Sequence, residues 1–80
     1  MHPISALPLN QEAVISDLTL PQRQRQQFED LGFTPGSIVR PLHRSPSGNL
    51  TAYAVMGSVI ALRRCDASHI LCDPKGGTVR

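Results

Sequence analysis

The chain is poor in aromatic and charged residues. Its 80 residues include no Trp, one Tyr and two Phe, and 18% are charged while 40% are hydrophobic. This balance is typical of a folded domain rather than a disordered segment. Three aromatics are too few for a groove that binds Pro-rich peptides or for a platform that stacks nucleic-acid bases. A chain of this length forms one small domain with little room for a deep catalytic cleft.

Several further absences narrow the function. Cys65 and Cys72 are the only cysteines, too few for a disulfide scaffold, and we expect reduced thiols in a cytoplasmic protein. No apolar run approaches the roughly 18 residues that span a bilayer, and the first ten residues lack the basic start of a signal peptide. There is no Gly-rich phosphate-binding loop and no recognisable Ser–His–carboxylate arrangement. We therefore expect a protein that is not an enzyme and does not insert into a membrane.

Short apolar and β-branched runs predict a mainly β domain. Residues 22–31, rich in Gln and Arg, predict one surface helix, which begins either with Pro21 in its first turn or with Thr19 and Gln22 as a capping box. Pro41 interrupts one predicted strand, which indicates an edge strand, open to pairing with a second chain, or a bulge. Together the elements predict a small β-barrel of about five strands with one surface helix and a second short helical turn at residues 65–68. The predicted strands are residues 13–15, 37–44, 50–55, 59–62 and 69–72.

The stretch DLGFTPGSIV, residues 30–39, predicts a sharp corner between the helix and the next strand. Gly32 is placed to end the helix, and Phe28 and Phe33 then stand at the two positions that touch in a Schellman ending. Residues 34–37 fit a type II turn, with Pro35 at its second position and Gly36 at its third.

This corner resembles the "LGL-TPG" signature of FeoA-type domains. The loop SPSGN, residues 45–49, stands where that family has a loop close to APLGDP. Residues 62–64, Leu-Arg-Arg, followed by Asp66 and Ala67, resemble the family segment LALRREDA. The resemblance covers about residues 4–72. It implies one SH3-like β-barrel domain over residues 1–80, with a core of about 4–72 and a flexible tail at 73–80.

The resemblance also implies a function. FeoA domains are small cytoplasmic proteins of bacterial ferrous iron uptake, thought to act on FeoB, a membrane permease with a cytoplasmic GTPase domain. We therefore expect an adaptor or regulator without a cofactor that works by protein contact. Its contact surface is expected at the corner and at the 45–49 loop, because both are rich in backbone-shaping residues and lie outside the expected core. The expected contact residues are Leu31, Gly32, Phe33, Thr34, Pro35, Gly36, Ser45, Pro46, Gly48 and Asn49.

An alternative function is direct binding or sensing of a transition metal. Cys65, His69 and Cys72 are residue types that bind iron or zinc, and their spacing is C-x-x-x-H-x-x-C. This is not a usual zinc spacing, and a helical turn followed by a strand would spread the three side chains apart. We expect no metal site beyond weak association of Fe²⁺ or Zn²⁺.

Arginines form a second pattern. Arg40 and Arg44 lie on one predicted strand, and Arg63 and Arg64 lie near the end of another. They predict a basic edge that could meet an acidic partner or a nucleic acid. Acidic residues are interspersed and the net charge is only +2, so we interpret the edge as a solvated surface and expect no nucleic-acid partner.

Overall fold

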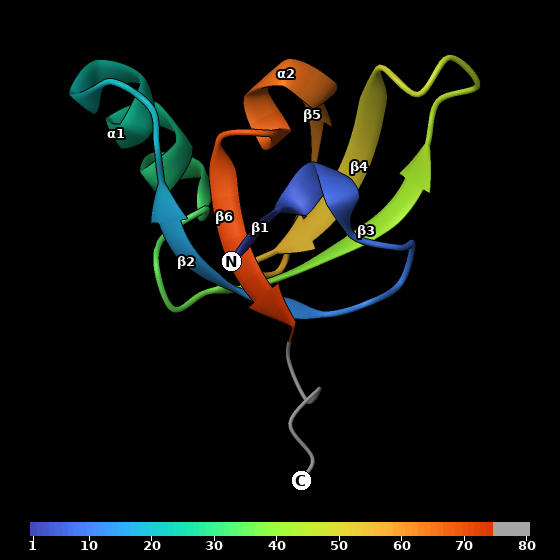
Figure 1. The fold of residues 1–80 in the computed structure, drawn as a ribbon, viewed down its shortest axis with the longest axis horizontal. Helices are drawn as coiled ribbons and strands as arrows, with labels where there is room; N and C mark the ends of the chain where they lie inside the picture. The colour runs from blue at the N-terminus through green and yellow to red at the C-terminus, as the bar shows by residue number, and fades with distance from the viewer. Residues whose placement is uncertain (75–80) are drawn as a thin grey trace, which may run out of the picture.

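One antiparallel sheet organises the computed structural model, which describes residues 1–74 (Figure 1). Its strands lie in the order β1-β6-β2-β3-β4-β5. The sheet curves round so that a 3₁₀ turn, η1, and the short helix α2 lie between its two arms, while helix α1 lies beside β2 (Figure 1). The elements are β1 (His2–Pro3), η1 (Ile4–Ala6), β2 (Ala13–Leu18), α1 (Gln22–Leu31), β3 (Ile38–Arg44), β4 (Leu50–Val55), β5 (Ser58–Arg63), α2 (Arg64–Ala67) and β6 (Ile70–Pro74).

The mainly β prediction is confirmed, with six strands in the described chain instead of about five. In β4 the buried residues Thr51, Tyr53 and Val55 alternate with more exposed neighbours, because successive side chains of a strand point to opposite faces. The second helical turn, predicted at residues 65–68, is α2. The hydrophobic core consists of Ile4, Leu7, Ala13, Ile15, Leu18, Phe33, Val39, Tyr53, Val55, Leu62, Ala67, Ile70 and Cys72.

Pro41 marks a bulge in β3. The register between β3 and β4 shifts between Pro41 and His43, and β3 is an interior strand between β2 and β4. The Pro41 ring is fully buried, and its carbonyl accepts a hydrogen bond of 2.6 Å from the Asn10 backbone N–H. The edge-strand alternative is therefore wrong, and the bulge shifts the residues after Pro41 relative to the sheet face.

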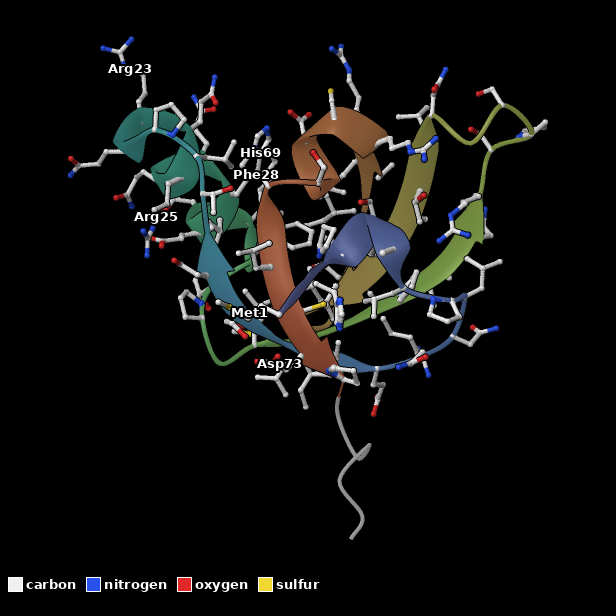
Figure 2. All side chains as sticks on the ribbon, viewed as in Figure 1. Met1, Arg23, Arg25, Phe28, His69 and Asp73 are labelled. Atoms are coloured by element: carbon white, nitrogen blue, oxygen red, sulfur yellow. The ribbon has the colours of Figure 1, made fainter. Side chains whose placement is uncertain are left out.

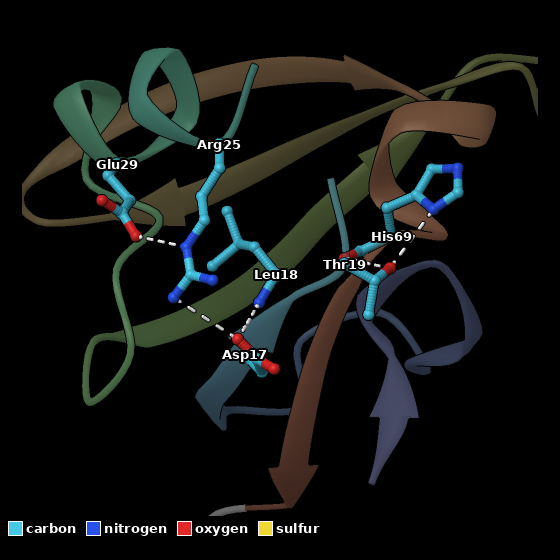
Figure 3. A network of polar contacts seen from close by, with 6 residues as sticks. All are labelled: Asp17, Leu18, Thr19, Arg25, Glu29 and His69. Atoms are coloured by element: carbon cyan, nitrogen blue, oxygen red, sulfur yellow. Dashed lines mark hydrogen bonds and ion pairs between the residues drawn. The ribbon is translucent and has the colours of Figure 1, made fainter. Parts of the chain in front are cut away.

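Helix α1 begins at Gln22 without a side-chain cap. The Thr19 hydroxyl donates to the His69 carbonyl at 3.2 Å, so the capping-box prediction is wrong, and Pro21 lies one position earlier than predicted. The helix instead joins β2 through Arg25, which pairs with Asp17 at 3.5 Å and with Glu29 at 3.0 Å (Figure 3). The hydrogen bond to Glu29 is the main reason that the pKa of Arg25 is raised.

Strand β6 lies between β1 and β2, so it joins both ends of the described chain. His2 pairs with Cys72, and Cys72 also pairs with Ile15. The N-terminal amine lies 3.5 Å from the Asp73 carboxylate, and Met1 and Asp73 are labelled in Figure 2. Strand β6 runs through Pro74, two residues into the segment predicted as a tail, and the rest of that segment, residues 75–80, lies outside the described residues. Within residues 1–74 no helix is long and apolar enough to cross a membrane.

Candidate interaction surface

The corner after α1 is built by local backbone hydrogen bonds. Gly32 has a φ of +114°, and its N–H donates to the Glu29 carbonyl at 3.0 Å. The Phe33 N–H donates to the Phe28 carbonyl at 3.0 Å, which completes the predicted Schellman ending. The rings of Phe28 and Phe33 meet edge to face with centroids 6.4 Å apart.

The next four residues form the predicted turn and attach it to β2. The Ser37 N–H donates to the Thr34 carbonyl at 3.0 Å, and Gly36 has a φ of +94°, as a type II turn requires. The Gly36 N–H donates to the Ile15 carbonyl at 2.8 Å, and Ser37 accepts a bond from the Ile15 N–H at 2.8 Å. The corner is therefore held to the sheet and sets the direction of β3.

Phe33 is not available for contact. Its side chain is 0% exposed, and its ring packs edge to face against Tyr53 with centroids 6.4 Å apart. The expectation that the whole corner lies outside the core is therefore wrong at Phe33. Leu31, Pro35 and Gly36 are exposed, and Gly32 and Thr34 are partly exposed. Leu31, the last residue of α1, is 46% exposed.

The corner lies against a residue that the sequence interpretation missed, Met56. A Cβ built on Gly32 would lie 2.9 Å from Met56 Cγ, so Met56 crosses the space that a side chain at Gly32 would fill. Met56 is 70% exposed and lies in the tight turn between β4 and β5. Ile38 is 40% exposed and lines the same shallow hollow as Met56. We call Leu31, Gly32, Ile38 and Met56 the corner surface: Gly32 lies against Met56, Ile38 lines the same hollow as Met56, and Leu31 directly precedes Gly32.

The 45–49 loop lies away from the corner surface. The corner leads into β3 at Ile38, and the loop follows β3 after Arg44, so the two are separated by the length of a seven-residue strand, about 20 Å. Figure 1 shows the loop between β3 and β4 on the opposite side of the molecule from the α1–β3 connection. The two predicted halves of the contact surface are therefore not brought together.

The three candidate metal ligands lie in different environments. Cys72 is fully buried, and burial is the main reason that its pKa is raised. Cys65 is exposed on α2, and His69 Nδ1 lies 3.3 Å from the Thr19 hydroxyl (Figure 3). Among residues 1–74 no three His, Cys, Asp or Glu side chains are grouped so that they could hold a metal ion. The residues present do not fit a three-ligand centre.

The predicted basic edge is divided, because Arg40 lines a different hollow from the one that Arg44 and Arg64 share. Arg40 lines the hollow beside Ile38 and Met56. Arg44 lies after the bulge, and its Nη2 donates to the Leu7 carbonyl at 2.7 Å. Arg63 and Arg64 lie where β5 meets α2. The bulge at Pro41 thus helps to separate a pattern that the sequence suggests is continuous.

Comparison with known proteins shows which family the chain matches. The family model for the FeoA domain matches residues 2–74, and no curated protein sequence matches the chain significantly. The FeoA protein from Chlorobium tepidum superimposes with a TM-score of 0.88 at 23% identity, over 98% of this chain and 73% of that one. Iron(II) transport protein A from Clostridium thermocellum gives 0.88 at 25% identity, over 96% of this chain and 47% of that one.

A third solved structure adds a description of the fold. The FeoA of Stenotrophomonas maltophilia, solved in complex with zinc, superimposes with a TM-score of 0.76 at 27% identity, over 91% of this chain and 89% of that one. That protein is described as a prokaryotic SH3 domain protein and a candidate activating factor for ferrous iron transport. The predicted SH3-like class is confirmed by this likeness together with the mainly β sheet.

Proposed function

The chain belongs to the FeoA family, which is implicated in ferrous iron transport, and from this we propose that it is a cytoplasmic adaptor or regulator of bacterial ferrous iron uptake. Its partner is a membrane GTPase permease of the FeoB type, contacted from the cytoplasmic side. It acts by binding and not by catalysis, because an 80-residue barrel with a filled core has little room for a catalytic cleft.

The corner surface supports this proposal best. Leu31, Ile38 and Met56 are 46%, 40% and 70% exposed. The backbone of the neighbouring turn is held in place by its hydrogen bonds to β2. A preformed backbone lowers the entropy cost of binding. Met56 adds a flexible side chain that can adapt to a partner. Thr34, Pro35 and Gly36 extend this surface along the turn.

The 45–49 loop is a separate contact in this proposal, because about 20 Å of strand divides it from the corner. It contributes Ser45, Pro46, Gly48 and Asn49. Bonds within the loop fix its shape: the Ser45 N–H donates to the Leu50 carbonyl at 2.9 Å, and the Gly48 N–H donates to the Ser45 carbonyl at 2.9 Å. A partner that binds both contacts has to extend along the length of β3.

The experiment compares two leucines of equal exposure. Leu31 lies in the corner surface and Leu50 lies beside the loop, and each is 46% exposed. Binding of Leu31→Glu, Met56→Glu and Leu50→Glu to the cognate GTPase domain and to the full permease is measured by calorimetry. We expect the two corner variants to bind at least about tenfold more weakly, the loss that a hot-spot residue gives, while their melting temperatures stay near that of the parent.

Two results would count against this assignment. Absence of binding by the parent chain to both the domain and the permease would refute the partnership. Loss of binding in Leu50→Glu alone would move the contact to the loop end and refute the corner.

Direct metal sensing is a second candidate only because the Stenotrophomonas maltophilia relative was solved with zinc. In this chain Cys72 faces the core and does not fit a ligand set with Cys65 and His69. We therefore propose no resident cofactor. Anaerobic titration of Fe²⁺ and Zn²⁺ into the parent and into Cys65→Ser/Cys72→Ser tests this, and tight binding that the double variant loses would overturn it.

A further inference from the structure

A small polar hollow of about 260 Å³ opens beside the 45–49 loop, and Gly48 is the only one of its lining residues that the proposed partnership uses. It lies where η1, the end of β3, the strand β4 and the start of α2 converge. Four elements from distant parts of the sequence thus contribute to one recess. Its lining residues are Ser5, Arg44, Gly48, Thr51, Tyr53 and Arg64.

The hollow has an unbalanced positive charge. Two of its lining residues are arginines and none is acidic. The ion pairs within residues 1–74 involve Arg25 and the N-terminal amine, so no carboxylate of these residues forms an ion pair with Arg44 or Arg64. Two positive charges beside one recess repel each other, and an anion bound between them removes that repulsion.

One of the three donors is held by a side-chain hydrogen bond before any ligand arrives, and a second is held at its backbone. Arg44 is exposed, and its Nη2 donates to the Leu7 carbonyl at 2.7 Å, which leaves most of its five N–H donors available. The Arg64 backbone N–H donates to the Asn49 carbonyl at 2.8 Å, which fixes the base of that side chain. The Ser5 hydroxyl makes no hydrogen bond within residues 1–74.

The base of the hollow is buried and already satisfied. Tyr53 is 1% exposed and Thr51 is 6% exposed. The Tyr53 hydroxyl lies 3.5 Å from the Ile4 carbonyl. Burial raises the pKa of Tyr53, and the nearby charge of Arg44 partly opposes this effect. The base therefore supplies a neutral, partly dehydrated surface on which a charge-assisted hydrogen bond is stronger than in water.

We propose that this hollow binds the phosphate group of a small molecule or free phosphate, with Arg44, Arg64 and Ser5 as donors. The three donors come from three elements, η1, β3 and α2, and an oxyanion with three or more acceptor oxygens can accept from all of them at once, whereas a carboxylate has two oxygens. Guanidinium groups match phosphate oxygens in charge and geometry. A volume of about 260 Å³ equals on the order of nine water molecules, enough for one phosphate group and less than drug-sized ligands occupy.

The test is an amide chemical-shift titration of the full chain with inorganic phosphate, methyl phosphate and acetate. We expect saturable shifts at Ser5, Gly48 and Arg64 with millimolar phosphate and weaker effects with acetate. Binding of methyl phosphate as well as phosphate supports a phosphorylated small molecule as the ligand. Binding of phosphate alone supports the free ion.

Variants distinguish a built site from general positive charge. Arg64→Gln is expected to bind phosphate about tenfold more weakly, because it removes a charged hydrogen bond. Ser5→Ala is expected to bind more weakly by a smaller factor. Arg63→Gln removes the same charge from the adjacent position, outside the hollow, and should bind as the parent does. Arg44→Gln is not used, because it also removes the bond to the Leu7 carbonyl.

Three results would overturn the proposal. They are no saturable shift at millimolar phosphate, equal weakening by Arg63→Gln and Arg64→Gln, and binding of acetate as tight as that of phosphate. The first removes the site, the second reduces it to a charge effect, and the third removes the preference for an oxyanion with three or more oxygens. Because none of these measurements involves the permease, the outcome does not depend on the partnership proposed above.

Discussion

Replacing Gly32 by alanine tests how much the corner contributes to the stability of the domain. The φ of +114° is a conformation that residues with a side chain adopt only at a cost of about 1–3 kcal/mol. The lower entropy of the unfolded chain offsets about 0.4–1 kcal/mol of this. The new Cβ would also lie 2.9 Å from Met56 Cγ and 3.1 Å from Met56 Cβ. The exposed Cγ can rotate away, but Cβ is fixed by the backbone.

We therefore expect Gly32→Ala to lose about 3 kcal/mol, of which about 1–2 is net backbone strain and about 1 comes from the contact with Met56, and this lowers the melting temperature by roughly 12–24 °C for a domain of this size. Gly36→Ala is the matched control, since Gly36 also has a positive φ, +94°, but a Cβ there would meet nothing within 4 Å. It should lose the backbone strain alone, about 1–2 kcal/mol. Thermal unfolding followed by circular dichroism measures both. Equal losses would refute the contribution of Met56, and an unchanged Gly32→Ala would refute the reasoning altogether.

Three further predictions concern the core, acid stability and the thiols. Phe33→Ala, at a site that is 0% exposed, should destabilise the domain by about 3–5 kcal/mol in urea unfolding, and a loss below about 1 kcal/mol would contradict its place in the core. The pKa of Asp73 is lowered, chiefly by the hydrogen bond from Ser16. The ionised carboxylate therefore stabilises the fold at pH values above its ordinary pKa of about 3.9, and this stabilisation is lost as the pH falls through the lowered pKa. Asp73→Asn should therefore be less stable than the parent near neutral pH, with the difference shrinking in strong acid, and a constant difference would rule this out. Cys65 is exposed and Cys72 buried, so a thiol reagent should modify only Cys65 in the native chain and both in denaturant, whereas fast modification of both would disprove the buried position.

The corner could be predicted from the sequence because its determinants are local. Gly32 ends the helix and Pro35 with Gly36 form the turn within five residues, and each signal has a direct conformational cause. The strands β3, β4 and β5 were predicted within one residue at each end for the same reason, since short turns separate them.

Features that depend on distant contacts were missed. Strand β1 has two residues and is defined only by its pairing with β6, about 70 residues later, so no periodicity could identify it. The burial of Phe33 depends on Tyr53, and the exposure of Met56 depends on the turn after β4. An apolar residue in a tight turn, as in the pair Met56 and Gly57, was the available signal for the corner surface.

The predicted grouping of Arg40 with the other arginines was wrong for a related reason. Arg40 and Arg44 would share a face of a regular strand, because side chains alternate with a period of two. The bulge after Pro41 breaks that register, and the sequence alone left open whether Pro41 makes a bulge or an edge. The hollow that Arg44 shares with Arg64 could not be found from spacing along the chain, since it needs η1 and α2 to meet β4.

The position of β6 between β1 and β2 has a consequence for the order of events during synthesis. As the chain leaves the ribosome, β3, β4 and β5 can pair as successive hairpins with short loops, which favours early folding. Strand β2 pairs with β3 through only two residues, and most of its pairing is with β6. Strand β1 pairs with β6. The N-terminal strands are therefore made first but are fixed in the sheet last. A nascent chain that stalls before Ile70 would expose the apolar side of β2 to other chains until translation resumes.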